Sequence, residues 1–266
     1  MKTVIQLYEN LKQKVQFLYT QLKLDRQEKT KGRKSALSIT DIITLSIFKQ
    51  KNHIAAKKAL YEIFDPPCSY KTLVVNMNRY ARLAMILPTF LLNLNRVSSH
   101  PVKHTDSTDI PVCTNRKAEH HKTMQGLASR GKTGKGSFYG LKLHITADLK
   151  RKLLSVRFSG IIDDRKIFMR LNKGLSGIFA ADAGYISQKL QKESYVEHKR
   201  ILFAKPRANM KKVITEFQNF LYGTRMLIEL NFRSLKLFYG LVASMPRSVS
   251  GYLANYIYSL LAYQIA

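Results

Sequence analysis

Cysteine is scarce in this chain of 266 residues. Cys68 and Cys113 are the only two, too few and too isolated to build a disulfide framework. Cys113 comes shortly before His120 and His121, but this spacing is not that of a zinc site. We therefore expect both cysteines to be ordinary reduced thiols.

Long hydrophobic runs are also missing. The N-terminus has no apolar stretch of the signal-peptide type. The most apolar segment, residues 252–266, is short and carries Asn255, Gln264 and several tyrosines. This pattern predicts a buried C-terminal helix and no membrane span. We expect a cytoplasmic, nucleoid-associated protein.

Acidic residues are few as well. The chain has 17 of them against 45 lysines and arginines, which gives a formal net charge of +28. The excess is spread along the chain, with basic runs at residues 29–34, 150–152 and 205–207. This balance predicts a polyanionic partner, double-stranded DNA in particular, and binding that weakens steeply as salt is added. RNA and anionic membranes are the alternatives that charge alone leaves open.

The first hundred residues show the periodicity of helices. The chain is 45% hydrophobic and long enough to bury a sizeable core. Helices are expected at residues 3–23, from 38 onward, at 53–63 and at 70–95. Ser38 and Asp41 have capping-box spacing at the start of the second helix. We assign residues 1–98 to an all-helical N-terminal domain that binds DNA, with packing or dimerisation as its alternative role.

The pattern changes to strands after residue 101. Strands are expected at residues 102–113, 138–147, 153–158, 178–182 and 201–204. Helices are expected at residues 164–171, 185–199 and 214–238. Three sequential strands, followed by alternating helices and strands, predict an α/β fold in which helices flank a mixed sheet. We assign it to residues 99–266.

Two carboxylates fall where such a sheet would place a site. Asp106 lies inside the first strand, where a carboxylate must find a partner or a metal. Asp182 ends the fourth strand, at the edge where open sheets bind ligands, although an aspartate there is also a common turn residue. Asp109 is a rival for Asp106 on the opposite strand face. Asp164, which otherwise caps a helix, is an alternative second acid.

The expected helix at residues 214–238 carries an unusual polar stripe. Four of its side chains fall within a narrow arc of one face: Tyr222, Arg225, Glu229 and Lys236. A solvated, salt-bridged helix face is the plain interpretation. The alternative is a site for a cation beside a phosphate. Together with Asp106 and Asp182, Glu229 would supply oxygen ligands for two magnesium ions, with manganese as a substitute.

A basic segment at residues 116–135 precedes the second strand. Within it, residues 126–133 match the phosphate-loop pattern G-x4-G-K-[ST]. Such a loop follows a buried strand and opens a helix, whereas here polar residues precede it and a strand follows. We therefore reject a nucleotidase or an ATP-driven helicase. We interpret the segment as a flexible basic loop that contacts the DNA backbone through Arg130, Lys132 and Lys135, with plain solvated disorder as the alternative.

Four motifs occur in an informative order. They are DSTDIPVC at residues 106–113, FYGLKLH at 138–144, DAGY at 182–185 and the Tyr222/Arg225/Glu229/Lys236 helix. This order resembles that of a bacterial insertion-sequence transposase with a DDE triad, of the insertion-sequence nine-eight-two group or a close relative. The resemblance covers roughly residues 100–266.

The resemblance implies a ribonuclease H-like fold, magnesium, and cleavage and joining of DNA at the ends of a mobile element. Asp106, Asp182 and Glu229 would be the catalytic metal ligands. A homodimer or larger assembly would bring two ends together with target DNA. The alternatives are a metal-dependent nuclease of the same fold and a catalytically idle DNA-binding protein derived from such an element.

The same resemblance assigns DNA contacts. Tyr222, Arg225 and Lys236 would contact the terminal DNA of the element, with the arginine and the lysine on backbone phosphates near the cut.

Overall fold

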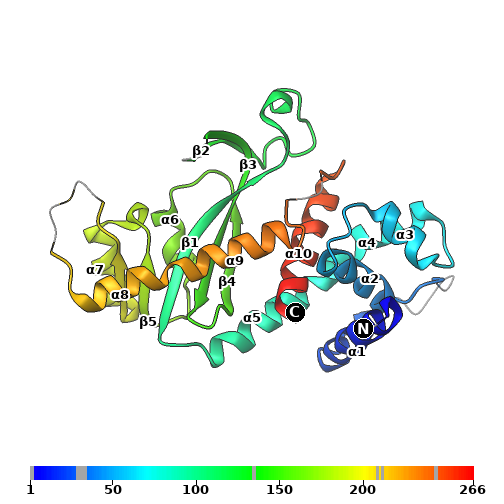
Figure 1. The fold of residues 1–266 in the computed structure, drawn as a ribbon, viewed down its shortest axis with the longest axis horizontal. Coiled ribbons are helices and arrows are strands. Elements are labelled where there is room, and N and C mark those ends of the chain that lie inside the picture. The colour runs from blue at the N-terminus through cyan, green and yellow to red at the C-terminus, as the bar shows by residue number, and fades with distance from the viewer. Residues whose placement is uncertain (1–2, 28–34, 134–135, 208–209, 211–212, 243–244) are drawn as a thin grey trace. The chain divides into compact units, whose positions relative to one another are not determined.

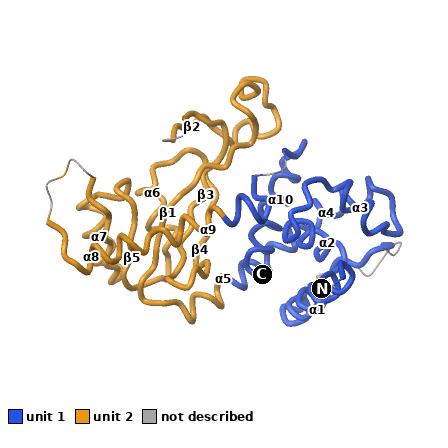
Figure 2. The backbone as a smooth tube through the Cα atoms, in the orientation of Figure 1, with its two compact units in different colours: residues 1–91, 234–266 blue, residues 92–233 orange. Residues whose placement is uncertain are grey.

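The computed structural model describes residues 3–27, 35–133, 136–207, 210, 213–242 and 245–266. The basic run at residues 29–34 and the predicted DNA contact Lys135 lie outside the described residues. Two compact units make up the chain (Figure 2). The first unit contains residues 1–91 and 234–266, and the second contains residues 92–233. The first unit therefore combines both ends of the chain.

This division differs from the sequence-based boundary after residue 98. That boundary assigned residues 234–266 to the catalytic domain, whereas in the structure they belong to the unit of the N-terminal helices. The physical reason is the C-terminal helix, whose Tyr258 and Leu261 are buried in the same apolar core as Ile42 and Met77. Sequence order alone does not reveal that contact.

The first unit is helical. Its elements are α1 (Val4–Gln21), the short 3-10 helix η1 (Leu24–Gln27), α2 (Ile39–Lys51), α3 (Lys57–Phe64), α4 (Tyr70–Ala84), the start of α5 (Ile86–Val97) and α10 (Val249–Ile265) (Figure 1). Helix α10 packs against α2 and α4. The Tyr258 hydroxyl donates a hydrogen bond to the Met77 carbonyl at 3.0 Å, which ties α10 to α4. No described helix combines the length and apolar composition that a membrane crossing requires.

Helix α2 begins where the sequence predicts. The Ser38 hydroxyl accepts the Asp41 amide at 3.0 Å, and the Asp41 carboxylate accepts the Ser38 amide at 3.3 Å. This reciprocal pair is the predicted capping box, which satisfies two amides that the helix itself leaves free. The same carboxylate pairs with Lys12 at 2.8 Å and so joins α1 to α2.

The helix expected at residues 70–95 is two helices. Helix α4 ends at Ala84, and α5 begins at Ile86. Pro88 has no amide hydrogen to bond the Ala84 carbonyl, and its ring would clash with that carbonyl in a continuous helix. The break moves Pro88 into the first turn of α5, where a missing amide costs nothing.

One lysine lies in the interior of the helical unit. Lys49 of α2 is only 5% exposed, and its ammonium group donates to Gln50 Oε1 at 3.4 Å. Burial, with a smaller effect of the Lys57 charge, lowers the pKa of Lys49 to about 8. The charged form of Lys49 is therefore disfavoured in the folded state.

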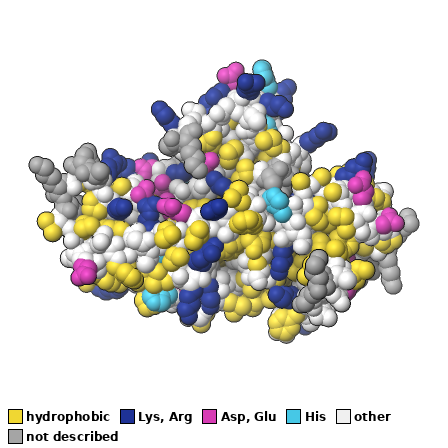
Figure 3. Space-filling view, in the orientation of Figure 1, with side chains coloured by type: hydrophobic (Ala, Val, Ile, Leu, Met, Phe, Trp, Pro, Cys, Tyr) yellow, Lys and Arg dark blue, Asp and Glu magenta, His cyan; other side chains and the backbone are white. Residues whose placement is uncertain are grey.

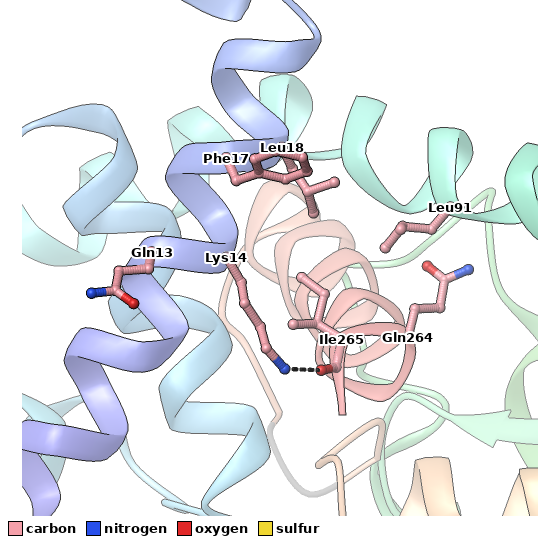
Figure 4. A pocket seen from close by; sticks show the side chains of 7 residues that line it. All are labelled: Gln13, Lys14, Phe17, Leu18, Leu91, Gln264 and Ile265. Carbon is pink, nitrogen blue, oxygen red and sulfur yellow. Dashed lines mark hydrogen bonds between the residues drawn. The ribbon is translucent and has the colours of Figure 1, made fainter.

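A pocket of about 430 Å³ opens on the same unit (Figure 4). Its lining residues come from α1, α5 and α10: Gln13, Lys14, Phe17, Leu18, Leu91, Gln264 and Ile265. Of these, Lys14 alone is charged, and its ammonium group donates to the Ile265 carbonyl at 3.3 Å. The mainly apolar lining gives this pocket no cluster of charged groups for nucleic-acid chemistry.

The second unit contains a mixed sheet, as predicted. The described strands are β1 (Val102–Pro111), β2 (Ser129–Thr133), β3 (Gly136–Asp148), β4 (Leu153–Ser159), β5 (Gly177–Ala181) and β6 (Arg200–Ala204). Their order is β2-β3-β1-β5-β6, and β4 pairs with β3 as well. Strand β3 is antiparallel to β1, β2 and β4, whereas β5 is parallel to β1 and β6 is parallel to β5.

Helices cover both faces of this sheet. Helix α8 (Glu216–Thr224) lies on one face, where Leu221 packs against Ala180 of β5. Helix α6 (Asp164–Leu171) lies on the other, where the rings of Phe168 and Phe179 are 5.6 Å apart. Helix α7 (Gln188–His198) packs against β6, and a short 3-10 helix, η3 (Ala183–Tyr185), follows β5.

Two local predictions are wrong. The basic segment expected to be a flexible loop contains β2, which pairs with residues 136–140 of β3. The helix expected at residues 214–238 is divided into α8 and α9 (Met226–Leu237). At the division the Thr224 hydroxyl donates to the Leu221 carbonyl at 2.9 Å, and such back-bonding bends helices. Gly223 weakens the same turn.

Candidate active site

Asp106 lies in the middle of β1, which is hydrogen-bonded on both edges in the sheet. Its side chain faces the side of the sheet that α8 covers, because His104, two residues earlier, contacts Thr224 of α8 at 3.0 Å. One carboxylate oxygen of Asp106 accepts the Ser107 amide at 2.8 Å. Burial raises the pKa of Asp106 to about 6, although Arg225 opposes the shift. A buried carboxylate of this kind favours a cationic partner.

Asp182 follows directly after β5, at the carboxyl edge of the sheet. Its side chain is 52% exposed. Burial raises the pKa of this carboxyl, but the Ala183 amide and the Arg225 guanidinium outweigh it, so the pKa lies below its ordinary value. Asp182 is therefore ionised at neutral pH and available to a cation.

Glu229 is in the first turn of α9 and is exposed. An acidic residue is favourable there, because the amides at a helix N-terminus carry partial positive charge. Since α8 ends at Thr224 and α9 begins at Met226, the division of the helix sets the position of Glu229 relative to the sheet.

Arg225 stands between the two helices and contacts all three acids. Its guanidinium lies 2.6 Å from Asp182, 3.0 Å from Glu229 and 3.8 Å from Asp106, measured between nitrogen and oxygen. The arginine side chain is only 15% exposed. Burial lowers its pKa, but the charges of Asp106 and Asp182 outweigh that effect and raise it. Two strands and one helix therefore bring the three carboxylates to a single guanidinium.

The donor chemistry of this cluster suits a hard divalent cation. Three carboxylates offer oxygen ligands, the type that magnesium and manganese take. Among the described residues, however, no group of three or more acidic, histidine or cysteine side chains is close enough together to hold a metal ion. In this arrangement the Arg225 guanidinium is the cation that contacts all three acids. The oxygen atoms of Asp106, Asp182 and Glu229 are therefore of the type that a divalent cation binds, but here all three acids contact Arg225.

Asp164, the alternative second acid, has other partners. Its carboxylate pairs with Lys142 at 2.7 Å and with His144 at 3.4 Å. Both partners are on the sheet face that α6 covers, as is Asp109, which is opposite Lys142 in the register of β1 and β3. Asp109 and Asp164 therefore do not join the Arg225 cluster through these contacts.

His144 and Asp163 have structural roles. His144 is fully buried, its Nε2 lies 2.8 Å from the Ser159 hydroxyl, and burial lowers its pKa to about 4. Asp163 caps α6 by accepting the Arg165 amide at 2.9 Å.

Sequence reasoning missed two groups beside the site. Tyr185 is 1% exposed, and its hydroxyl has no hydrogen-bond partner among the described residues. Burial and the nearby acids, Asp164 and Asp106 among them, raise the pKa of that hydroxyl well above its ordinary value. The second group is Lys142, which pairs with Asp164. The DAGY motif contains Tyr185, but no sequence signal shows that the ring is buried close to the acids.

The predicted DNA contacts are in different surroundings. Tyr222 is 9% exposed, and its hydroxyl donates to the Ala204 carbonyl at 3.2 Å, so it joins α8 to β6 here. Lys236 is in the last turn of α9, within the helical unit. Arg130 and Lys132 are exposed on β2, where Arg130 pairs with Glu119 at 3.1 Å. Lysine and arginine side chains are spread over the face drawn in Figure 3 instead of gathering in one patch.

A carboxylate cluster on a mixed α/β sheet, in a strongly basic chain, is characteristic of enzymes that act on nucleic acids. The family described as the transposase DDE domain has a model that matches residues 97–249, more than half of the chain. The chain therefore belongs to the DDE transposase family, which confirms the predicted resemblance to a DDE transposase. Comparison with curated proteins gives no match.

Proposed function

We propose that this protein is a DNA transposase that cuts phosphodiester bonds at the ends of its mobile element and joins the freed hydroxyl to target DNA. The observation that carries the proposal is the convergence of Asp106, Asp182 and Glu229 on one guanidinium. The order of strands supports a ribonuclease H-like fold, since β3 pairs antiparallel with both β1 and β4, and β5 and β6 extend the sheet in parallel on the other side of β1. The insertion-sequence nine-eight-two group is the proposed branch of the family.

In this proposal the three carboxylates would hold two Mg²⁺ or Mn²⁺ ions. When bound, such ions activate the attacking oxygen and stabilise the leaving oxygen of a phosphodiester. Asp106 lies in a strand that pairs with β3 from Lys103 to Pro111, so its backbone would fix the position of the site. Asp182 and Glu229 are more exposed, so their side chains would have more room to adjust to the bound ions.

Basic residues would place the DNA. Arg225 and Lys236 contact backbone phosphates near the cut, and Arg130, Lys132 and Lys135 contact the backbone further away. Tyr222 contacts terminal DNA in the family pattern, which requires its hydroxyl to leave the Ala204 carbonyl. The helical unit binds DNA, and a dimer or larger assembly in the cytoplasm joins two element ends.

The test measures magnesium-dependent cleavage of a duplex that carries the inverted repeats flanking this gene. Asp106→Asn, Asp182→Asn and Glu229→Gln should each reduce cleavage roughly a hundred- to a thousandfold, because each removes a ligand charge, while DNA binding stays close to that of the unaltered protein. Asp109→Asn, on the opposite face of β1, and Glu216→Gln, exposed in α8, are the matched controls.

Normal cleavage by Glu229→Gln would overturn the active-site assignment. A strand-transfer assay with a plasmid target then separates the remaining possibilities. Cutting without joined product identifies a nuclease, and binding without cutting by the unaltered protein identifies a DNA-binding protein that has no catalytic activity.

A further inference from the structure

Arg225 occupies an unusual position for a residue expected to bind DNA. Its guanidinium is mostly enclosed and contacts acids from β1, from the end of β5 and from α9. A guanidinium has five donors in a rigid fork, so a single arginine can bridge several carboxylates. In this structure the Arg225 side chain therefore faces the three carboxylates and not the solvent, from which a DNA phosphate would approach.

Electrostatics explains why some cation must be there. Asp106, Asp182 and Glu229 all lie within 4 Å of one group, and three carboxylates that close repel one another strongly. One guanidinium offsets one of the three charges. The cluster therefore keeps a strong preference for further positive charge, which a divalent ion supplies better than an arginine.

The guanidinium and a metal compete for the same oxygen atoms. Arg225 contacts one oxygen of each acid, and the shortest contact, to Asp182, is 2.6 Å. At Asp106 the other oxygen already accepts the Ser107 amide, so the oxygen that faces Arg225 is the one left for a metal. Magnesium binds oxygen ligands at only about 2.0–2.1 Å, which leaves no space for an arginine nitrogen between the ion and the oxygen.

We infer that Arg225 is an exchangeable counter-ion: it holds the three carboxylates together before metal binds, and it moves to a backbone phosphate of bound DNA when divalent ions replace it. This inference rests on the proposed function and deepens it. Metal binding and DNA binding then strengthen one another, because each stabilises the state in which the guanidinium has left the acids.

The competition can be measured without DNA and without catalysis. Manganese is titrated by calorimetry into the DNA-free protein of 266 residues and into Arg225→Gln, which keeps a polar side chain but removes the charge. Arg225→Gln should bind manganese at least about tenfold more tightly, because no cation has to be displaced. Arg225→Lys keeps the positive charge but replaces the guanidinium with a single ammonium group. Its affinity for manganese should lie between those of the unaltered protein and of Arg225→Gln.

Two further variants locate the effect. Arg233→Gln removes the same charge from an exposed site eight residues along α9, and it should bind manganese as the unaltered protein does. The double variant Arg225→Gln/Asp106→Asn should lose the gained affinity. Equal or weaker manganese binding by Arg225→Gln, or no binding at all, would overturn the inference.

Nuclear magnetic resonance tests the unaltered protein directly. With ¹⁵N-labelled arginine, and Arg225→Lys to identify the signal, the Arg225 guanidinium should exchange slowly with water before magnesium is added and quickly after saturation. An unchanged signal at saturation means that the arginine stays in place, which contradicts the inference. Manganese should also strengthen duplex binding more in the unaltered protein than in Arg225→Gln, and equal strengthening contradicts the transfer to phosphate.

Failure of this inference can be told apart from failure of the proposed function. If acid variants abolish cleavage but Arg225→Gln gains no manganese affinity, the transposase assignment stands and the counter-ion role is wrong. If Arg225→Gln gains affinity through Asp106 while acid variants still cleave normally, the ion exchange is real and the active-site assignment is wrong.

Discussion

Among individual residues, Lys49 gives a direct test of how charge is buried in the helical unit. Replacing it with Met keeps an unbranched apolar stem and removes the buried ammonium group. Because the folded-state pKa of about 8 is below the unfolded value of 10.5, Lys49→Met should raise the free energy of unfolding at pH 7 by about 2–3 kcal/mol. Thermal and denaturant unfolding followed by circular dichroism measure the change.

The pH dependence of that difference has a definite sign. Between about pH 8 and 10.5 the unfolded chain holds a proton on Lys49 that the folded chain has released, so the stability of the unaltered protein rises with pH relative to the variant. The excess free energy of unfolding of Lys49→Met over the unaltered protein should therefore become smaller between about pH 8 and 10.5. Lys58→Met, which removes a mostly exposed lysine from α3, is the control and should show no such trend. A constant difference from pH 7 to 10 would contradict the account.

Residue types in the candidate site were predictable, but their contacts were not. A carboxylate inside a strand and another at a strand end are visible in the sequence as Asp106 and Asp182. The bridge through Arg225 depends on where α8 ends and on how α8 and α9 follow the sheet. The burial of Tyr222 and Tyr185 depends on the same packing, so the sequence did not reveal it, and the DNA contact of Tyr222 stays a prediction.

At the scale of elements, the hairpin of β2 and β3 presents Arg130 and Lys132 on its exposed side. Arg130→Gln/Lys132→Gln should weaken duplex binding regardless of sequence, and the slope of log affinity against log salt should fall by roughly two. Fluorescence anisotropy over a range of salt concentrations measures that slope. The ion pair between Arg130 and Glu119 is exposed on both sides, so losing it should change the free energy of unfolding little.

A matched pair of exposed lysines provides the control for the hairpin. Lys189→Gln/Lys192→Gln removes the same charge from α7. If both double variants reduce the slope equally, net charge alone explains the binding and the hairpin has no special role. If the slope of log affinity against log salt is unchanged in Arg130→Gln/Lys132→Gln, β2 is not part of the DNA interface.

Most elements could be predicted because each carries a local signal. The capping box at Ser38 and the alternation in β1, β3 and β4 act within a few residues. Three features depended on more than periodicity. Pro88 divides α4 from α5, Thr224 and Gly223 divide α8 from α9, and β2 forms because β3 offers residues 136–140 as a partner edge. A short polar strand has no apolar alternation by which a sequence could reveal it.

On the scale of the whole molecule, the helical unit depends on both ends of the chain. A fragment of residues 1–91 should fail to fold, because α10 supplies Ala254, Tyr258 and Leu261 to its core. Co-expression with residues 234–266 should restore helical circular dichroism and a cooperative thermal transition. Independent folding of residues 1–91 or 1–98 would show that the core does not need α10.

The interrupted helical unit also affects how the protein is made. On a ribosome the N-terminal helices emerge first, and the whole of residues 92–233 must be translated before their C-terminal partner exists. At elongation rates of about 5–20 residues per second that interval is on the order of ten seconds, during which apolar side chains such as Ile42 and Met77 lack their final cover. Nascent chains should therefore recruit chaperones. A truncated message would yield a product that proteases remove, which limits the damage an incomplete copy of the gene can cause.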